Sequence, residues 1–215
     1  MGEGQNSFDR FVAFSFQCVI RINGGLEVIG IENIPEQGGA LVAANHISYL
    51  DPPAIGSVIP RKPTFMARKG LFEVPVLKWF IRHFAFPVDR ERPRPSTIKD
   101  AIKRLRSGEL VLMFPEGRRN ESGELSTAKR GIGMIASLSR VPVIPAVIIG
   151  SDRALPPDAR WLKRAKISVV FGKPLDFNSL KDEIKNDSHA LHEEISNAIM
   201  SEILGLQQRF AQRDR

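Results

Sequence analysis

The chain has 215 residues, of which 42% are hydrophobic, and this fits one globular domain rather than a disordered or multi-span protein. No stretch reaches the roughly 18 consecutive apolar residues that a membrane-spanning helix needs. The single cysteine, Cys18, excludes a disulfide bond within the chain and fits a reducing compartment. The formal net charge is +7, and between Arg61 and Arg106 thirteen Lys and Arg outnumber four Asp and Glu, so we expect a negatively charged partner.

The first 24 residues are predicted to hold an amphipathic helix. Its apolar side chains are Phe8, Phe11, Val12, Phe14, Phe16 and Val19. Such a segment can lie in a membrane interface with its apolar side in lipid, or it can be a first helix docked on the core. As a working hypothesis we divide the chain into an N-terminal interfacial helix, residues 1–24, and a main domain, residues 25–215.

Beyond this helix, short apolar strands alternate with amphipathic helices. The predicted strands cover residues 26–30, 40–44, 64–67, 85–88, 110–114, 143–149 and 167–171. The predicted helices cover residues 52–58, 71–84, 98–105 and 129–140, and a long C-terminal helix runs from Leu180 to Phe210. Since the strands at 110–114 and 143–149 are apolar throughout, we predict an α/β fold with a largely parallel central sheet flanked by helices.

The strand at 40–44 leads directly to His46, and Asp51 follows five residues later. On one continuous helix these side chains would point about 140° apart, because each residue turns the helix by roughly 100°. Asp followed by Pro is typical of a helix start, so we expect a turn carrying His46 and a helix whose N-cap is Asp51. The carboxylate could then orient the imidazole as a general base. The alternative is that His46 is an ordinary polar residue and Asp51 only a cap.

Several predicted strands end in polar or charged residues. These are His46, Lys69, Arg90, and Glu116 with Arg118. In open α/β sheets, ligands bind at the carboxyl ends of the strands. Arg suits bidentate phosphate contacts, Lys supplies a point charge, and Gly117 lets the backbone approach a ligand closely. The pattern predicts an anionic, phosphorylated substrate that has a proton to lose.

Four segments of this sequence resemble the motifs of the glycerophospholipid acyltransferases, the group that includes 1-acylglycerol-3-phosphate acyltransferase. In chain order they are Asn45-His46-x4-Asp51, Phe86-Pro87-Val88-Asp89-Arg90, Phe114-Pro115-Glu116-Gly117-Arg118 and Val141-Pro142-Val143-Ile144-Pro145. One His-x4-Asp motif is weak evidence, whereas four motifs in the family's order and spacing are specific. The resemblance covers roughly residues 26 to 175.

The resemblance implies an acyl transfer that needs no acyl-enzyme. His46, oriented by Asp51, would take the proton from the free hydroxyl of a lysophospholipid, and that oxygen would attack the thioester of acyl-CoA or acyl-carrier protein. The Val141–Pro145 motif would help form an apolar wall along the acyl chain. No cofactor and no metal are implied beyond the acyl donor. The acceptor-binding positions would be Arg90, Glu116, Gly117 and Arg118, with Lys69 as a further phosphate contact.

The same resemblance implies partners and a location. The substrates would be a lysophospholipid and an acyl thioester, and acyl-carrier protein is the protein partner to consider. We expect an anionic membrane surface, with the enzyme on its cytoplasmic face as a peripheral or monotopic protein. Arg119 and Asn120 stand where the family commonly has a small hydroxyl residue, which leaves the acceptor preference open.

Other interpretations use the same residues differently. One is an acyltransferase for another lysophospholipid, and another is a non-catalytic protein that binds anionic lipid through its basic region. The second gives His46 and Asp51 no role. Glu116 could form a salt bridge with Arg118 or Arg90 instead of contacting substrate. Lys129 and Arg130 are expected to face solvent or lipid phosphate rather than substrate. No nucleic-acid partner is predicted, because the basic region has core-like aromatic spacing and no recognisable nucleic-acid module.

Overall fold

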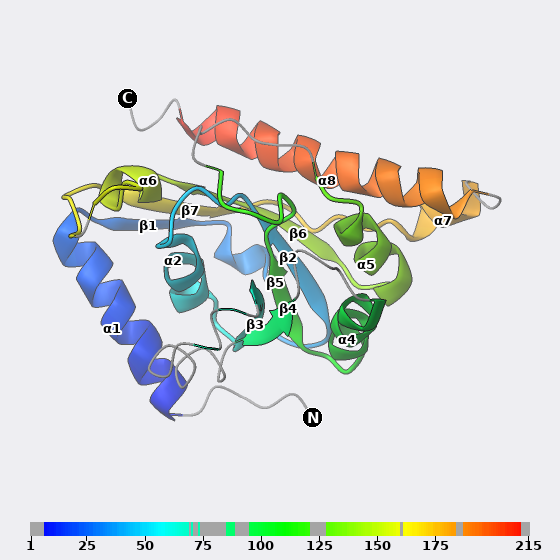
Figure 1. The fold of residues 1–215 in the computed structure, drawn as a ribbon, viewed down its shortest axis with the longest axis horizontal. Coiled ribbons are helices and arrows are strands. Elements are labelled where there is room, and N and C mark those ends of the chain that lie inside the picture. The colour runs from blue at the N-terminus through cyan, green and yellow to red at the C-terminus, as the bar shows by residue number, and fades with distance from the viewer. Residues whose placement is uncertain are drawn as a thin grey trace.

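Seven strands of the computed structural model form one sheet (Figure 1). They are β1 (Leu26–Ile29), β2 (Ala40–Ala44), β3 (Pro63–Arg68), β4 (Ala85–Val88), β5 (Leu110–Met113), β6 (Val143–Ile149) and β7 (Ile167–Phe171). Their order across the sheet is β1-β7-β6-β2-β5-β3-β4. The structure describes residues 7–68, 70, 73, 85–88, 95–120, 128–159, 161–183 and 187–211.

Helices cover both faces of this sheet. They are α1 (Ser7–Asn23), α2 (Asp51–Val58), α4 (Pro95–Arg106), α5 (Gly131–Ser139), α6 (Ser151–Ala154), α7 (Asn178–Glu183) and α8 (Ser188–Ala211), with a 3-10 turn η1 (Ile31–Asn33). Apolar residues of α1 and α2 pack on one face, and those of α4, α5 and α8 pack on the other. Figure 1 shows these layers, with α8 above the sheet and α1 and α2 below it.

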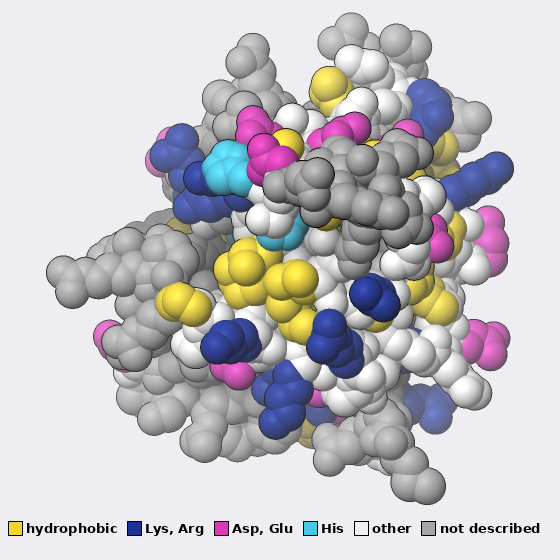
Figure 2. Space-filling view, turned by 90° about the vertical axis from the view of Figure 1, so that its right-hand side faces the viewer, with side chains coloured by type: hydrophobic (Ala, Val, Ile, Leu, Met, Phe, Trp, Pro, Cys, Tyr) yellow, Lys and Arg dark blue, Asp and Glu magenta, His cyan; other side chains and the backbone are white. Residues whose placement is uncertain are grey.

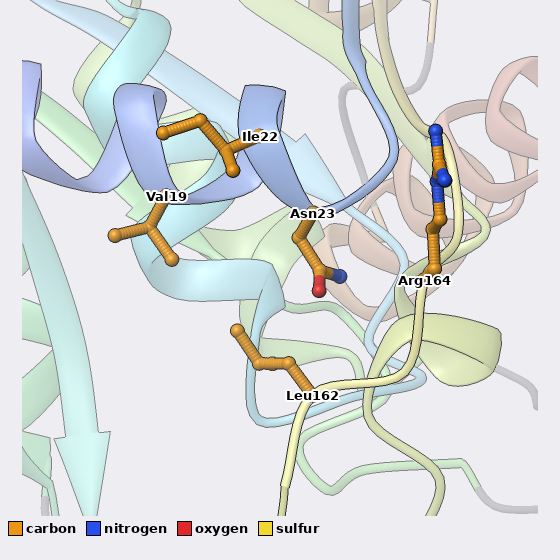
Figure 3. A pocket seen from close by; sticks show the side chains of 5 residues that line it. All are labelled: Val19, Ile22, Asn23, Leu162 and Arg164. Atoms are coloured by element: carbon orange, nitrogen blue, oxygen red, sulfur yellow. The ribbon is translucent and has the colours of Figure 1, made fainter.

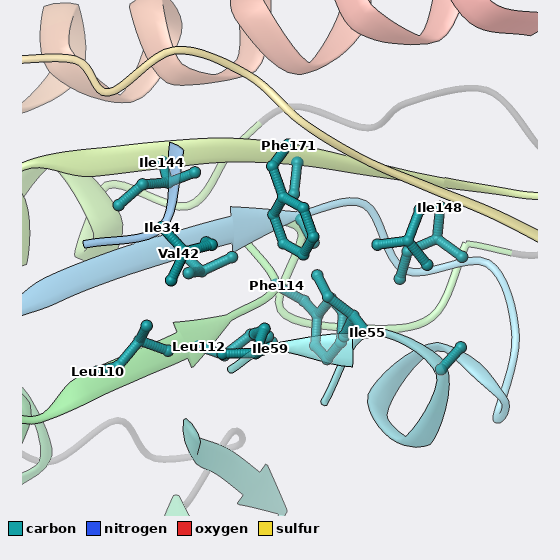
Figure 4. Close-up of a cluster of buried hydrophobic side chains, with 14 of the residues drawn as sticks. Ile34, Val42, Ile55, Ile59, Leu110, Leu112, Phe114, Ile144, Ile148 and Phe171 are labelled. Carbon is teal, nitrogen blue, oxygen red and sulfur yellow. The ribbon is translucent and has the colours of Figure 1, made fainter. Parts of the chain in front are cut away.

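The central strands are apolar on both faces because both faces are covered. In β2, Val42 points into the cluster with α2, and its neighbours Leu41 and Ala43 point into the cluster with α5 and α8. Figure 4 shows the first cluster, to which Val42 of β2, Leu112 of β5 and Ile55 of α2 all belong. The predicted buried strands are confirmed.

Most of the sheet is parallel, as predicted. The neighbouring strands β6, β2, β5, β3 and β4 all run in one direction, whereas β7 pairs antiparallel with β6 and parallel with β1. The carboxyl ends of the five parallel strands therefore lie along one edge of the sheet. The loops that leave this edge carry the predicted chemistry.

The C-terminal helix differs from the prediction. One helix from Leu180 to Phe210 was predicted, but the structure has α7 and α8 as separate helices. The Asp187 carboxylate accepts hydrogen bonds from the backbone N–H groups of His189 and Ala190 at 2.9 and 3.0 Å, which is the geometry of a helix N-cap. The apolar periodicity continues across this boundary, so it concealed the capping residue. Apart from Glu73, the predicted helix at 71–84 lies outside the described residues.

Helix α1 docks on the core by one side only. Its buried residues are Asp9 and Ile20, and the Asp9 carboxylate lies 3.3 Å from the ammonium group of Lys62. The opposite side of α1 is exposed and apolar.

At the far end of the molecule, where α4, α5 and the start of α8 lie, a group of hydrophobic side chains has basic side chains below it and acidic ones above it (Figure 2). Both signs of charge are therefore present on that face.

Candidate active site

His46 and Asp51 meet at the carboxyl end of β2. Nδ1 of His46 lies 2.9 Å from Oδ2 of Asp51, and the two side chains are only 10% and 0% exposed. The same Oδ2 accepts hydrogen bonds from the backbone N–H groups of Ile47 (2.6 Å) and Ser48 (2.7 Å). Because a carboxylate only accepts hydrogen bonds, this contact places the imidazole proton on Nδ1 and leaves the Nε2 lone pair available.

The prediction that Asp51 is the N-cap of α2 is wrong. Asp51 is the first residue of the helix, and the N-cap is Leu50, which makes no side-chain capping bond. Pro52 and Pro53 follow Asp51, so the first two helical positions after it have no N–H group to donate to its side chain. The carboxylate therefore turns back to the preceding amides and to His46. The two prolines were the sequence signal for this outcome.

The loop after β5 holds the main chain of His46. Oε1 of the buried Glu116 accepts a hydrogen bond from the N–H of His46 at 3.0 Å. The N–H of Asn120 donates to the carbonyl of His46 at 2.7 Å, and the Asn120 amide donates to Oε2 of Glu116 at 3.1 Å. The sequence left two roles open for Glu116, a salt bridge with Arg118 or Arg90, or a contact with substrate. In the structure Glu116 also holds the main chain of His46.

The same loop covers the imidazole ring with Phe114, and two cations lie on the loop or next to it. The rings of Phe114 and His46 stack with centroids 4.2 Å apart. Gly117 has a φ of 69°, in the left-handed region that favours glycine, and its N–H closes a turn to the Phe114 carbonyl at 3.0 Å. A Cβ at this position would come within 2.9 Å of the Lys129 side chain. Lys129 thus lies beside the loop, and Arg118 is exposed on it.

The two residues that depart from the family pattern both connect this loop to the His46 turn. The Arg119 guanidinium lies over the ring of Tyr49, with its carbon 3.9 Å from the ring centroid. Asn120 makes the hydrogen bonds to His46 and Glu116. The departures therefore affect how the loop is held.

The end of β6 holds the turn from the other side. The Asn45 side chain donates to the carbonyl of Ile148 at 3.0 Å and accepts from its N–H at 2.7 Å, so it extends the pairing of β2 with β6. The Ser151 hydroxyl donates to Oδ1 of Asp51 at 2.5 Å. Sequence reasoning missed Ser151, although it directly follows a buried strand and Gly150.

The structure brings together most of the predicted site residues. His46, Asp51, Glu116 and Gly117 lie in contact or on one short loop, and this loop also carries Arg118. Lys69 and Arg90 lie outside the described residues; the strands that precede them, β3 and β4, end at the same edge of the sheet.

The Val141–Pro145 motif was expected to form a wall for the acyl chain. Its residues Val143 and Ile144 are fully buried in the core clusters on the two faces of the sheet. In the described residues, the strand that carries this motif contacts the site through its carboxyl end.

This geometry suits a general base. The Nε2 atom of His46 has no hydrogen-bond partner among the described residues, while Nδ1 is fixed by a buried carboxylate. Within the described ranges, no group of three or more His, Cys, Asp or Glu side chains is placed to hold a metal ion. The fold and the site define an α/β protein with a histidine–carboxylate pair at the carboxyl edge of its sheet.

Comparison with known proteins identifies the family. A profile of the family described as Acyltransferase matches residues 25–149, more than half of the chain. The chain is 34% identical over 193 residues to a 1-acyl-sn-glycerol-3-phosphate acyltransferase of Bacillus subtilis, covering 86% of this chain and 94% of the relative. It is 31% identical over 196 residues to the enzyme of that name from Streptococcus pneumoniae, covering 89% and 69%. This chain belongs to the acyltransferase family.

A solved structure has the same fold. The crystal structure of a 1-acyl-sn-glycerophosphate acyltransferase from Thermotoga maritima matches with a TM-score of 0.74, over 93% of this chain and 79% of that chain. The sequence identity is 24%. The likeness confirms the α/β architecture with its mostly parallel sheet.

Proposed function

We propose that this protein is a 1-acylglycerol-3-phosphate O-acyltransferase, which moves a fatty acyl group from an acyl thioester to 1-acylglycerol 3-phosphate and forms phosphatidic acid. Relatives named for this activity cover most of the chain. The observation that carries the proposal is the buried pair of His46 and Asp51, with Nδ1 and Oδ2 2.9 Å apart, at the edge where the parallel strands end. A protein that only bound lipid would not need this pair.

The chemistry follows from the geometry of the pair. Nε2 of His46 takes the proton of the acceptor hydroxyl while that oxygen attacks the thioester carbonyl. The new C–O bond forms, the C–S bond breaks, and the leaving thiolate takes the proton from the imidazolium. Asp51 fixes the tautomer and stabilises the imidazolium. The reaction needs no cofactor, and the acyl donor is acyl-CoA or acyl-carrier protein.

We propose that the phosphate of the acceptor binds to cations on and beside the loop after β5, which carries Glu116. Arg118 is exposed on this loop and Lys129 lies beside Gly117, so both are available to an anion. Lys69 and Arg90 complete the proposed set. Glu116 is buried and holds the main chain of His46, which favours a positioning role over contact with substrate.

Substitution of the pair tests the proposal. We expect His46→Ala to lower kcat by about 10²–10⁴-fold, because it removes the general base, and Asp51→Asn to lower it strongly by removing the carboxylate that orients the base. The measurement is formation of labelled phosphatidic acid from 1-acylglycerol 3-phosphate with each donor. His189→Ala, at an exposed position of α8, is the matched control. Full turnover by a folded His46→Ala variant would refute the mechanism.

A parallel panel of other lysophospholipids tests the acceptor. If product forms only from another lysophospholipid, that lipid replaces 1-acylglycerol 3-phosphate as the proposed acceptor. Binding to anionic vesicles without any product would instead favour the non-catalytic alternative.

We also propose that the enzyme works at an anionic membrane, on its cytoplasmic face. No helix in the described part of the chain is both long and apolar enough to cross a bilayer. The proposal is supported by the outer side of α1, where Phe11 is 68% and Ile22 85% exposed. Arg10 and Arg21 are exposed on the same helix and suit lipid phosphates.

A second segment extends this apolar surface. Trp161 is 84% exposed. Its segment is anchored to the end of α1, because the Asn23 amide donates a hydrogen bond of 2.7 Å to the carbonyl of Lys163. Between α1 and this segment lies an open hollow of about 490 Å³, lined by Val19, Ile22, Asn23, Leu162 and Arg164 (Figure 3). Trp is favoured at membrane interfaces, and the adjacent cations complement anionic headgroups. We therefore assign α1 and residues 161–164 to one membrane-facing surface.

A further inference from the structure

We infer that Ser151 is a positioning residue for the acyl transfer, because its hydroxyl fixes the carboxylate that orients His46. The inference rests on the proposed role of His46 as the general base. Ser151 is the first residue of α6, just after β6, and it joins a pair made of His46, which follows β2, and Asp51, which starts α2. Ser151 acts through Asp51 and is not itself placed against substrate.

The contact is short, buried and distant in sequence. Oγ of Ser151 lies 2.5 Å from Oδ1 of Asp51, and both residues have no exposed surface. The other oxygen, Oδ2, already accepts from the His46 imidazole and from the N–H groups of Ile47 and Ser48. Ser151 therefore supplies the hydrogen bond to the second oxygen, and the carboxylate is held at both ends.

The backbone places Ser151 at this point. Gly150 has a φ of 82°, and a Cβ there would come within 2.2 Å of the carbonyl oxygen of Lys166, so the sharp exit from β6 requires glycine. The carbonyl of Ser151 accepts a hydrogen bond from the N–H of Leu155 at 2.9 Å. The hydroxyl thus reaches Asp51 from a fixed main chain.

The physical effect of this hydrogen bond is orientation. A carboxylate held by a single oxygen can rotate about its Cβ–Cγ bond, which would move Oδ2 away from Nδ1 of His46. Hydrogen bonds to a buried charged acceptor are among the strong ones in proteins, and leaving such an acceptor unsatisfied is costly. Without the Ser151 hydroxyl, Oδ1 of Asp51 loses the donor that the described residues give it, and we expect the carboxylate to hold the imidazole in a less defined orientation. The loss should appear in kcat rather than in KM.

The first test is a set of substitutions at Ser151. We expect Ser151→Ala to lower kcat by about 10–100-fold, the range for loss of a hydrogen bond to a charged group, with the KM values of acceptor and donor nearly unchanged. Ser151→Thr keeps the hydroxyl and should recover most of the rate. Ser139→Ala is the matched control, because Ser139 is also buried but its hydroxyl donates to a carbonyl within α5. The kcat of this control variant should equal that of the wild type. If Ser151→Ala does not fold, Ser151→Cys keeps a weak donor and should show a smaller loss of kcat.

A double-mutant cycle separates positioning from a purely structural role. In the Asp51→Asn background we expect Ser151→Ala to cost little further kcat, because both changes act on one interaction. Equal losses in the two backgrounds, or wild-type kcat for Ser151→Ala, would overturn the inference. Full activity of His46→Ala would instead overturn the proposed mechanism, so the two failures are distinguishable. Thermal unfolding of each variant confirms that folded protein was assayed.

Discussion

At the scale of single residues, His46 is held from four directions. Asp51 binds its ring nitrogen, Phe114 stacks on its face, Glu116 accepts from its N–H and Asn120 donates to its carbonyl. Preorganised catalytic groups need such support, because small displacements of the base cost rate. Only the contact with Asp51 was predicted from the sequence.

Glu116 gives a prediction that separates positioning from substrate binding. We expect Glu116→Ala to lower kcat about tenfold or more, because His46 loses a main-chain anchor, with a small effect on the acceptor KM. Arg118→Ala should instead raise the acceptor KM, since Arg118 is a proposed phosphate contact. Steady-state kinetics with varied acceptor measure both.

Glu116→Gln is the matched variant, because it keeps one oxygen for the N–H of His46, and it should retain more kcat than Glu116→Ala. A rise in acceptor KM alone for Glu116→Ala would show that Glu116 binds substrate.

At the scale of elements, the site is a product of three adjacent parallel strands. β2 leads to His46, β5 leads to Glu116, and β6 leads to Ser151. Their pairing makes residues that are about 70 and 100 positions apart in the chain neighbours in space. The start of α8 is controlled locally instead, because the Asp187 carboxylate accepts hydrogen bonds from the N–H groups of His189 and Ala190.

The α8 cap predicts a pH-dependent stability. Hydrogen bonds from the N–H groups of Ala190 and His189 hold the pKa of Asp187 below its ordinary value. A lowered pKa in the folded state means that this carboxylate stabilises the fold above its unfolded pKa and loses that effect as pH falls through the folded pKa. We expect Asp187→Ala to have a lower Tm than the wild type at pH 7, and the difference to shrink in strong acid.

Thermal unfolding across pH measures this effect, with Asp187→Asn as the control, because Asn caps helices without titrating. A Tm difference between Asp187→Ala and the wild type that stays constant into strong acid would contradict the assignment.

At the scale of the whole molecule, helices protect both faces of the sheet and leave its carboxyl edge to carry the site. Helix α1 has two sides with different partners: Ile20 joins the core, while Phe11 and Ile22 face outward. The sequence offered docking on the core and an interfacial role as alternatives, and one helix can serve both. The proposed membrane surface combines α1 with residues 161–164.

Vesicle binding tests that surface. We expect the double variant Ile22→Ser with Trp161→Ser to partition about tenfold or more less strongly onto vesicles of phosphatidylglycerol and phosphatidylcholine, because two apolar side chains no longer enter the interface. Added salt should weaken the binding of the wild type, since the adjacent cations contribute. Sedimentation with vesicles measures both effects.

Leu204→Ser is the control, because Leu204 is an exposed apolar residue on α8. Unchanged partitioning of the Ile22 and Trp161 variant, or an equal loss for Leu204→Ser, would contradict this surface.

The sequence by itself determined the fold class and, through the resemblance to the acyltransferase motifs, indicated the pair of His46 and Asp51. Strands such as Val143–Ile149 were predicted at their observed bounds, since apolar runs between turn residues depend on local composition and burial on both faces. The pairing of His46 with Asp51 was one of two interpretations that the local pattern left open, and the resemblance to the acyltransferase motifs favoured it. Only the tertiary structure decided that Glu116, Asn120 and Ser151 hold this pair. Their roles depend on which strands are neighbours in the sheet, and strand order is set by packing of the whole chain rather than by any local pattern.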